Sequence, residues 1–216
     1  MGSAEIQQQQ FIIYSHLVTY GKAANTEVTE RMREEIETMW NEPAGQLQLD
    51  GSVYTVVFKV TSSFEPAITD LDIYQNLDPR NNYFRIEEFA SGNISFVDGI
   101  GCNSGYFKLE NLYKGSTTAA HEYGHTLGLD HPDDLDLRGK GVPGIMYPRG
   151  TLVDPQYQYD PDKPAGTRGG TLNPVNRRVL QEDIDNLQLH HLTFTDGLAI
   201  LGEFTNTWHE DQADTG

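Results

Sequence analysis

The first third of the chain changes from a strand-like to a helix-like pattern of hydrophobic positions and back. Residues 11–20 (FIIYSHLVTY) and 53–60 (VYTVVFKV) are rich in β-branched and aromatic side chains, which predicts strands. Residues 26–40 instead carry apolar side chains at helical spacing among Glu and Arg, so they are expected to form an amphipathic helix with one face on a core. The apolar stripe of this helix consists of Val28, Met32, Ile36, Met39 and Trp40.

Shorter strand-like runs follow, and a glycine-rich loop separates the last two of them. The runs cover residues 71–77, 83–89, 93–97 and 106–112. The loop, residues 98–105 (DGIGCNSG), contains the single cysteine, Cys102. We expect Cys102 to be a small loop residue rather than a metal ligand. Ser116 or Thr117 then suits the N-cap of a further helix.

The C-terminal part has mostly the pattern of a loop. Residues 149–174 are rich in Tyr, Pro, Asp and Gly, and so long a stretch without periodicity is more typical of a substrate-binding loop than of a linker. Helical spacing returns over residues 176–189. Residues 193–201 are expected to form a hairpin around Asp196-Gly197.

The length of 216 residues allows one sizeable hydrophobic core with a short appendage. The first residues lack the basic and apolar regions of a signal peptide. A single cysteine allows no intramolecular disulfide and does not identify a compartment. We expect residues 1–10 to be an added or processed leading tail, residues 11–190 to form a single domain, and residues 191–216 to be an extension with a hairpin.

The formal net charge of −17 narrows the classes of partner. Phosphate binding needs clustered Lys and Arg, and the sequence has no such clusters. Neither nucleic acid nor an anionic membrane surface is therefore an expected partner. No apolar run approaches the roughly 18 residues that a membrane-spanning helix needs. The acidic composition favours solubility, with Ca²⁺ binding in acidic loops as a weaker alternative. We expect a monomer.

The candidate chemistry lies in residues 121–131 (HEYGHTLGLDH). His121 and His125 are four residues apart, so on a helix both imidazoles can bind one ion from the same side. Glu122 leaves the helix in another direction, and its carboxylate can reach a metal-bound water without becoming a ligand. Gly128 can adopt a positive φ and turn the chain back, which would bring His131 to the same ion.

Three neutral imidazoles would leave one coordination position open for water, which is the arrangement of a catalytic rather than a structural zinc site. The alternative is that these are ordinary histidines that happen to have this spacing. A bare HExxH arises by chance fairly often, whereas five specified residues over eleven positions do so far less often, which favours one catalytic Zn²⁺.

The complete motif HExxHxxGxxH, together with Ile145-Met146-Tyr147-Pro148, resembles the metzincin clan of zinc endopeptidases. Met-Tyr-Pro is most similar to the matrixins, and His131-Pro132 is similar to the serralysins. The resemblance implies an α/β (α+β) fold, a twisted, mostly parallel mixed sheet with an N-terminal helix, an active-site helix and a C-terminal helix. It also implies that Met146 forms an apolar floor beneath the three histidines. Serralysins and astacins carry a tyrosine where this chain has Pro148, so we expect no further protein ligand.

The resemblance implies a secreted, zinc-dependent endopeptidase that cleaves protein or peptide substrates with Glu122 as general base, and a pro-segment or inhibitor protein could control it. In the clan, substrate lies extended along an edge strand before the active-site helix, here near residues 99–107. The candidate substrate-binding residues are Gly101, Tyr106, Tyr147 and Tyr157. Three alternatives stay open: a zinc amidase acting on a non-protein amide such as a peptidoglycan cross-link, a protease or toxin domain excised from a larger protein, and a binding module with a structural metal.

Overall fold

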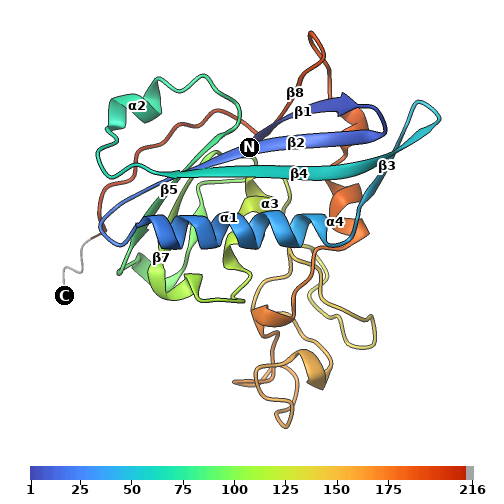
Figure 1. Ribbon diagram of the computed structural model, residues 1–216. Coiled ribbons are helices and arrows are strands. Elements are labelled where there is room, and N and C mark those ends of the chain that lie inside the picture. The colour runs from blue at the N-terminus through green and yellow to red at the C-terminus, as the bar shows by residue number, and fades with distance from the viewer. Residues whose placement is uncertain (213–216) are drawn as a thin grey trace.

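A computed structural model describes residues 1–212 as a mixed α/β fold built on one curled, mostly parallel sheet, as the sequence predicted (Figure 1). The strands are β1 (Gly2–Gln7), β2 (Gln10–Tyr20), β3 (Gln46–Leu49), β4 (Ser52–Phe64), β5 (Asn81–Glu87), β6 (Phe96–Val97), β7 (Ser104–Lys108) and β8 (Ala199–Leu201). The helices are α1 (Thr26–Asn41), α2 (Asp70–Tyr74), α3 (Thr118–Thr126) and α4 (Gln181–Asn186).

The strand order is β3-β4-β2-β5-β7-β6, with β1 beside the first half of β2 and β8 beside β1. The four central strands β4, β2, β5 and β7 are parallel, and the outer strands β3, β6, β1 and β8 are antiparallel to their neighbours. Because β6 pairs with β7 alone, β6 forms one free edge of the sheet. Strand β7, where residues 105–107 lie, is interior, so the free edge is β6 rather than the predicted 99–107.

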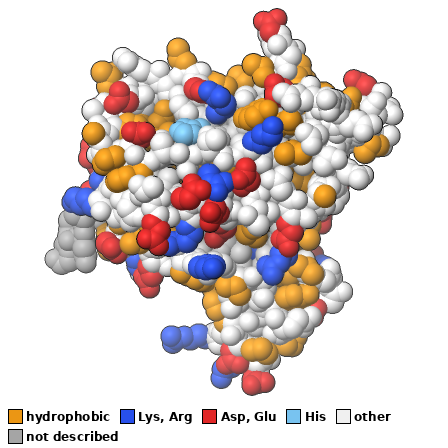
Figure 2. Space-filling model, in the orientation of Figure 1, with side chains coloured by type: hydrophobic (Ala, Val, Ile, Leu, Met, Phe, Trp, Pro, Cys, Tyr) orange, Lys and Arg blue, Asp and Glu red, His pale blue; other side chains and the backbone are white. Residues whose placement is uncertain are grey.

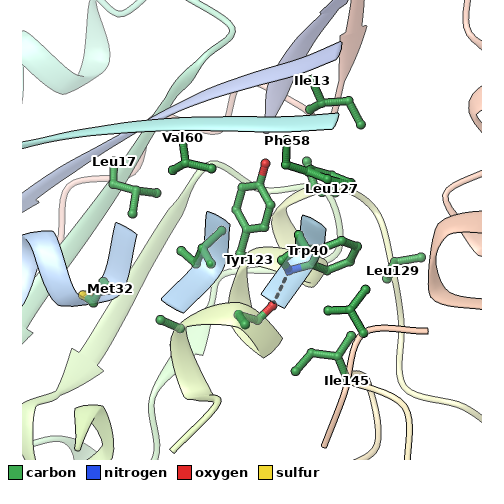
Figure 3. Close-up of a cluster of buried hydrophobic side chains, with 14 of the residues drawn as sticks. Ile13, Leu17, Met32, Trp40, Phe58, Val60, Tyr123, Leu127, Leu129 and Ile145 are labelled. Atoms are coloured by element: carbon green, nitrogen blue, oxygen red, sulfur yellow. Dashed lines mark hydrogen bonds between the residues drawn. The ribbon is translucent and has the colours of Figure 1, made fainter. Parts of the chain in front are cut away.

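Helix α1 packs across one face of the sheet and against α3 (Figure 1). It begins at Asn25, whose side chain accepts a hydrogen bond from the Val28 amide. Its apolar stripe is buried except for the partly buried Met39, and Trp40 at its end donates a hydrogen bond from Nε1 to the Ala120 carbonyl, 3.1 Å away. Figure 3 shows Trp40 and Tyr123 of α3 side by side in this core, beneath Phe58 and Val60 of β4. The core therefore fixes α3 directly against α1.

The predicted strand over residues 71–77 is wrong, because this segment forms the short helix α2. Thr69 and Asp72 make a capping box: the Thr69 hydroxyl accepts from the Asp72 amide, and the Asp72 carboxylate accepts from the Thr69 amide. This local pairing of side chains with backbone outweighs the alternating apolar pattern of the segment.

The predicted helix over residues 176–189 is much shorter, since α4 covers only residues 181–186. The residues before it are extended: Leu180 has β-region torsions, and the Arg178 amide donates to the Pro143 carbonyl at 2.9 Å. The bridge between Arg178 and Gly144 thus holds this segment against the chain just before Met146.

The predicted turn at Asp196-Gly197 is present, with φ of 51° and 83° at the two residues. It closes only one residue pair, Thr195 with Leu198. The next residues leave the turn as β8 and pair with β1, and residues 2–7, expected in a leading tail, form β1 itself. Segments from both ends of the described chain therefore meet in one strand pair.

The long loop region beyond α3 has a small core of its own. Leu137, Val153 and Leu172 are buried together, and Tyr147 and Tyr157 pack against them. Figure 1 shows this region, coloured yellow to orange, projecting below the sheet and α1, and Figure 2 shows it as a distinct lobe. Within residues 1–212, no helix is both long enough and apolar enough to cross a membrane.

Candidate metal centre

Three histidine side chains converge at the C-terminal half of α3. The Nε2 atom of His131 lies 3.1 Å from Nε2 of His121 and 3.2 Å from Nε2 of His125. Nitrogens bound at 2.0–2.1 Å to a tetrahedral zinc ion would be about 3.3 Å apart. In the described part of the chain, these three residues are the group of His, Cys, Asp or Glu side chains close enough together to hold a metal ion. The spacing of the donor atoms fits a single zinc ion.

Backbone carbonyls fix the tautomers of the two helical ligands. Nδ1 of His121 lies 2.7 Å from the Ile145 carbonyl oxygen, and Nδ1 of His125 lies 2.7 Å from that of Leu129. A carbonyl oxygen can only accept, so each Nδ1 carries the proton and each Nε2 presents its lone pair to the centre. Burial lowers the pKa of all three histidines, which favours the neutral form that binds metal.

The end of α3 is built around Gly128, which has a φ of 105°. The Leu129 amide donates to the Gly124 carbonyl and the Gly128 amide to the His125 carbonyl, each at 3.1 Å. This pair of bonds is a Schellman motif. The turn brings the Leu129 carbonyl to Nδ1 of His125 and directs His131 back towards the helix.

The start of α3 is held by a residue that the sequence pattern did not reveal. Thr117 stands at the N-cap position but does not cap the helix with its side chain: it has a left-handed φ of 58°, and its hydroxyl donates to the Pro174 carbonyl. The hydroxyl of Ser116, the residue before it, accepts from the Thr118 amide at 3.3 Å. The Glu35 carboxylate of α1 accepts from the amides of Ala120, Ala119 and Thr117. A negative charge there also suits the positive end of the helix dipole.

Met146 is buried at 3% exposure and packs on α3. Its sulfur packs directly on Gly124 of α3, where a Cβ atom would clash with it. The preceding residue, Ile145, supplies the carbonyl that orients His121. The segment at 145–146 thus packs against the helix and orients the ring of His121.

Glu122 is buried beside the histidines at 7% exposure. Burial raises the pKa of its carboxyl group to about 8, while the charges of Arg177 and Arg149 and a hydrogen bond from the Val97 amide act in the opposite direction. Its environment therefore gives this carboxylate a high affinity for a proton, which is a property of general bases.

The histidines and Glu122 open into a cleft of about 480 Å³. Its lining includes Phe96 and Val97 of β6, the free edge strand of the sheet, together with Pro148, Arg149 and Arg177. Unlike the three histidines and Glu122, the four residues expected to bind substrate lie outside the lining of this cleft.

These four residues have other contacts. The Gly101 amide donates to the His125 carbonyl at 2.7 Å, and buried Tyr106 donates its hydroxyl to the Phe89 carbonyl at 3.0 Å. Tyr147 and Tyr157 pack on the small core of the loop lobe. Cys102 is half-buried in its loop, as expected, and does not line the cleft.

No family model matches the chain, and no curated protein matches it. Among solved structures, archaemetzincin from Methanopyrus kandleri is similar with a TM-score of 0.42 and 13% identity, over 82% of this chain and 95% of that chain. Myroilysin is similar with a TM-score of 0.41 and 9% identity, over 88% of this chain and 100% of that chain. The chain is therefore only distantly similar to both proteins.

Proposed function

We propose that this chain is a zinc-dependent endopeptidase of metzincin type. One observation carries the proposal. The Nε2 atoms of His121 and His125 lie 3.1 and 3.2 Å from Nε2 of His131, in an open cleft beside the buried carboxylate of Glu122. His121, His125 and His131 would hold the ion. A purely structural site has no use for a buried base at its side or for an open cleft above it.

Zinc, when bound, polarises a carbonyl group and lowers the pKa of a coordinated water to about 7. Glu122 is the group of this chain that can take the proton from the attacking water and deliver it to the leaving amine. The Val97 amide, which donates to this carboxylate, fixes the base at the edge of β6. A peptide that paired with β6 by strand addition would run past Glu122 and the histidines.

The test is the variant Glu122→Gln, in which the amide can no longer accept a proton. We expect it to bind one zinc per chain, as the wild type does, and to lose at least about 10²-fold of its casein-cleaving activity. Glu34→Gln, which makes the same change on the exposed side of α1, is the control and should keep full activity. Equal casein cleavage by Glu122→Gln and wild type would refute the mechanism.

Metal content is tested separately with His131→Ala. Loss of one of three ligands should strongly weaken zinc binding, so unchanged zinc stoichiometry after dialysis would remove His131 from the site.

Purified peptidoglycan sacculi serve as a second substrate beside casein. Solubilisation of sacculi without cleavage of casein would favour the amidase alternative. The family resemblance further suggests secretion and control by a pro-segment or inhibitor protein.

A further inference from the structure

The cleft contains a buried guanidinium group that makes no close ion pair within residues 1–212, although the charge of Glu122 acts on it. Arg177 is only 4% exposed and lines the cleft together with Glu122 and the histidines. Its Nε is fully buried and has no hydrogen-bond partner, and within residues 1–212 its side chain forms no ion pair. By contrast, buried Arg85 pairs with Glu87 at 2.6 Å.

A buried cation is unfavourable where no anion lies in direct contact with it, because the group has lost water without gaining a salt bridge. Burial and the nearby charge of Arg149 lower the pKa of Arg177 to about 10, while the charge of Glu122 acts in the opposite direction, so the group still carries its charge at neutral pH. Exposed Arg149 lines the same cleft. Two cations thus face one cleft in a chain whose net charge is −17.

We propose that Arg177, assisted by Arg149, forms a subsite for a carboxylate group of the substrate. The inference rests on the proposed endopeptidase function and names its substrate class: peptides that carry a carboxylate near the scissile bond. A guanidinium is suited to this task because its planar donors match the two oxygens of a carboxylate. That carboxylate has two sources, an Asp or Glu side chain or the free C-terminus of a short peptide.

Cleavage kinetics distinguish the two sources. Three matched fluorogenic peptides are compared: one with Asp beside the scissile bond and an amidated end, one with Asn in its place and an amidated end, and one with Asn and a free C-terminus that follows shortly after. We expect kcat/KM for one carboxylate peptide to exceed that of the uncharged peptide by about 10- to 100-fold. The preferred peptide identifies the source.

The variant Arg177→Gln should reduce this preference to less than about threefold, because kcat/KM for the carboxylate peptide falls towards that for the uncharged peptide. Arg178→Gln is the matched control: Arg178 is the exposed neighbour on the same segment, and its guanidinium bonds to the backbone carbonyls of Val175 and Arg177 itself. It should keep the full preference. Arg177→Lys retains the charge without the planar fork and should give an intermediate preference, which also serves if Arg177→Gln does not fold.

Binding is measured apart from catalysis, so that the two proposals can fail separately. The chelator-treated wild type is titrated with the acetylated, amidated tripeptides Ala-Asp-Ala and Ala-Asn-Ala, and with acetylated Ala-Asn-Ala bearing a free C-terminus, by NMR. One carboxylate peptide should bind at least about tenfold more tightly than the uncharged one, with a difference that Arg177→Gln abolishes and added salt weakens.

If this binding difference is found but no peptide is cleaved, the endopeptidase function fails and the carboxylate subsite stands. Equal binding of all three tripeptides by the wild type would overturn the subsite. So would a preference that survives Arg177→Gln unchanged.

Discussion

Gly124 shows how closely a single position in α3 is constrained. A Cβ atom there would clash with the Met146 sulfur and lie 3.2 Å from Trp40 Cζ2. We expect Gly124→Ala to lower the free energy of unfolding by about 1–3 kcal/mol through overpacking, although Ala is the better helix former by about 1 kcal/mol. Urea denaturation of the metal-free protein measures this. Gly150→Ala is the control, since Gly150 has open space around its Cα, and an unchanged stability of Gly124→Ala would contradict the packing.

Asp183 gives the protein a specific pH dependence. Burial raises the pKa of its carboxyl to about 6, against an ordinary value of 3.8. Between these values the folded chain binds more protons than the unfolded chain, so this group makes the protein less stable as the pH rises from about 4 to about 6. The difference amounts to about 2–3 kcal/mol, since one pKa unit corresponds to about 1.4 kcal/mol.

The matching variant is Asp183→Asn, which keeps an oxygen able to accept from the Leu180 amide. The free energy of unfolding of the variant should not show this decrease. The variant should therefore become more stable than the wild type as the pH rises from 4 to 6. Urea denaturation at several pH values measures the difference. If the free energies of unfolding of the two proteins changed with pH in the same way, burial would not raise the pKa of Asp183.

At the scale of elements, the metal-binding helix depends on α1 for its first turn. Glu35→Ala removes the acceptor for the amides of Ala120, Ala119 and Thr117. We expect a loss of about 1–2 kcal/mol in stability, the usual range for a helix cap, and about tenfold weaker zinc binding because the ligand helix is less well positioned. Calorimetric zinc titration and thermal unfolding measure the two effects.

Glu34→Ala provides the control for this change, because the adjacent side chain is exposed on the same helix. It should leave zinc affinity and stability nearly unaltered. If Glu35→Ala bound zinc as tightly as Glu34→Ala does, the cap would have no influence on the site.

The sequence revealed the local part of the site and missed the long-range part. The spacing of His121, His125 and Gly128 depends only on helix geometry and on one positive φ, so eleven consecutive residues were enough to predict it. The Glu35 cap and the Ile145 carbonyl join segments that lie 85 and 24 residues from their partners, and no local pattern encodes them. Segment 71–77 is different, since the Thr69 and Asp72 spacing was a readable helix signal.

For the whole molecule, the proposed metal links ligation to stability. A ligand that binds only the folded state stabilises it by about 2.7 kcal/mol at a free concentration of 100 times Kd. We therefore expect the thermal midpoint to fall on treatment with EDTA and to recover when zinc is restored. His131→Ala is the control and should respond little to chelator. If neither EDTA nor zinc changed the thermal midpoint of the wild type, this would argue against a bound ion.

The sequence gives the net charge of the molecule but not where the charged side chains lie on its surface. Figure 2 shows acidic and basic side chains interspersed along α1, where Arg33 pairs with Glu30 and Glu37. The net charge of −17 therefore does not describe every part of the surface, and it did not predict that two arginines line the cleft. Their meeting depends on the extended segment before α4, which the helical spacing of residues 176–189 did not indicate.

The bonds from Nδ1 of His121 and His125 to backbone carbonyls also make the site visible to spectroscopy. Each ring proton is held inside the protein in a 2.7 Å hydrogen bond, so its exchange with solvent is slowed. Slowly exchanging imidazole protons give separate proton NMR signals. The two ligands of α3 thus carry their own reporters, and the arrival of an ion at Nε2 can be followed from the far side of each ring without a substrate.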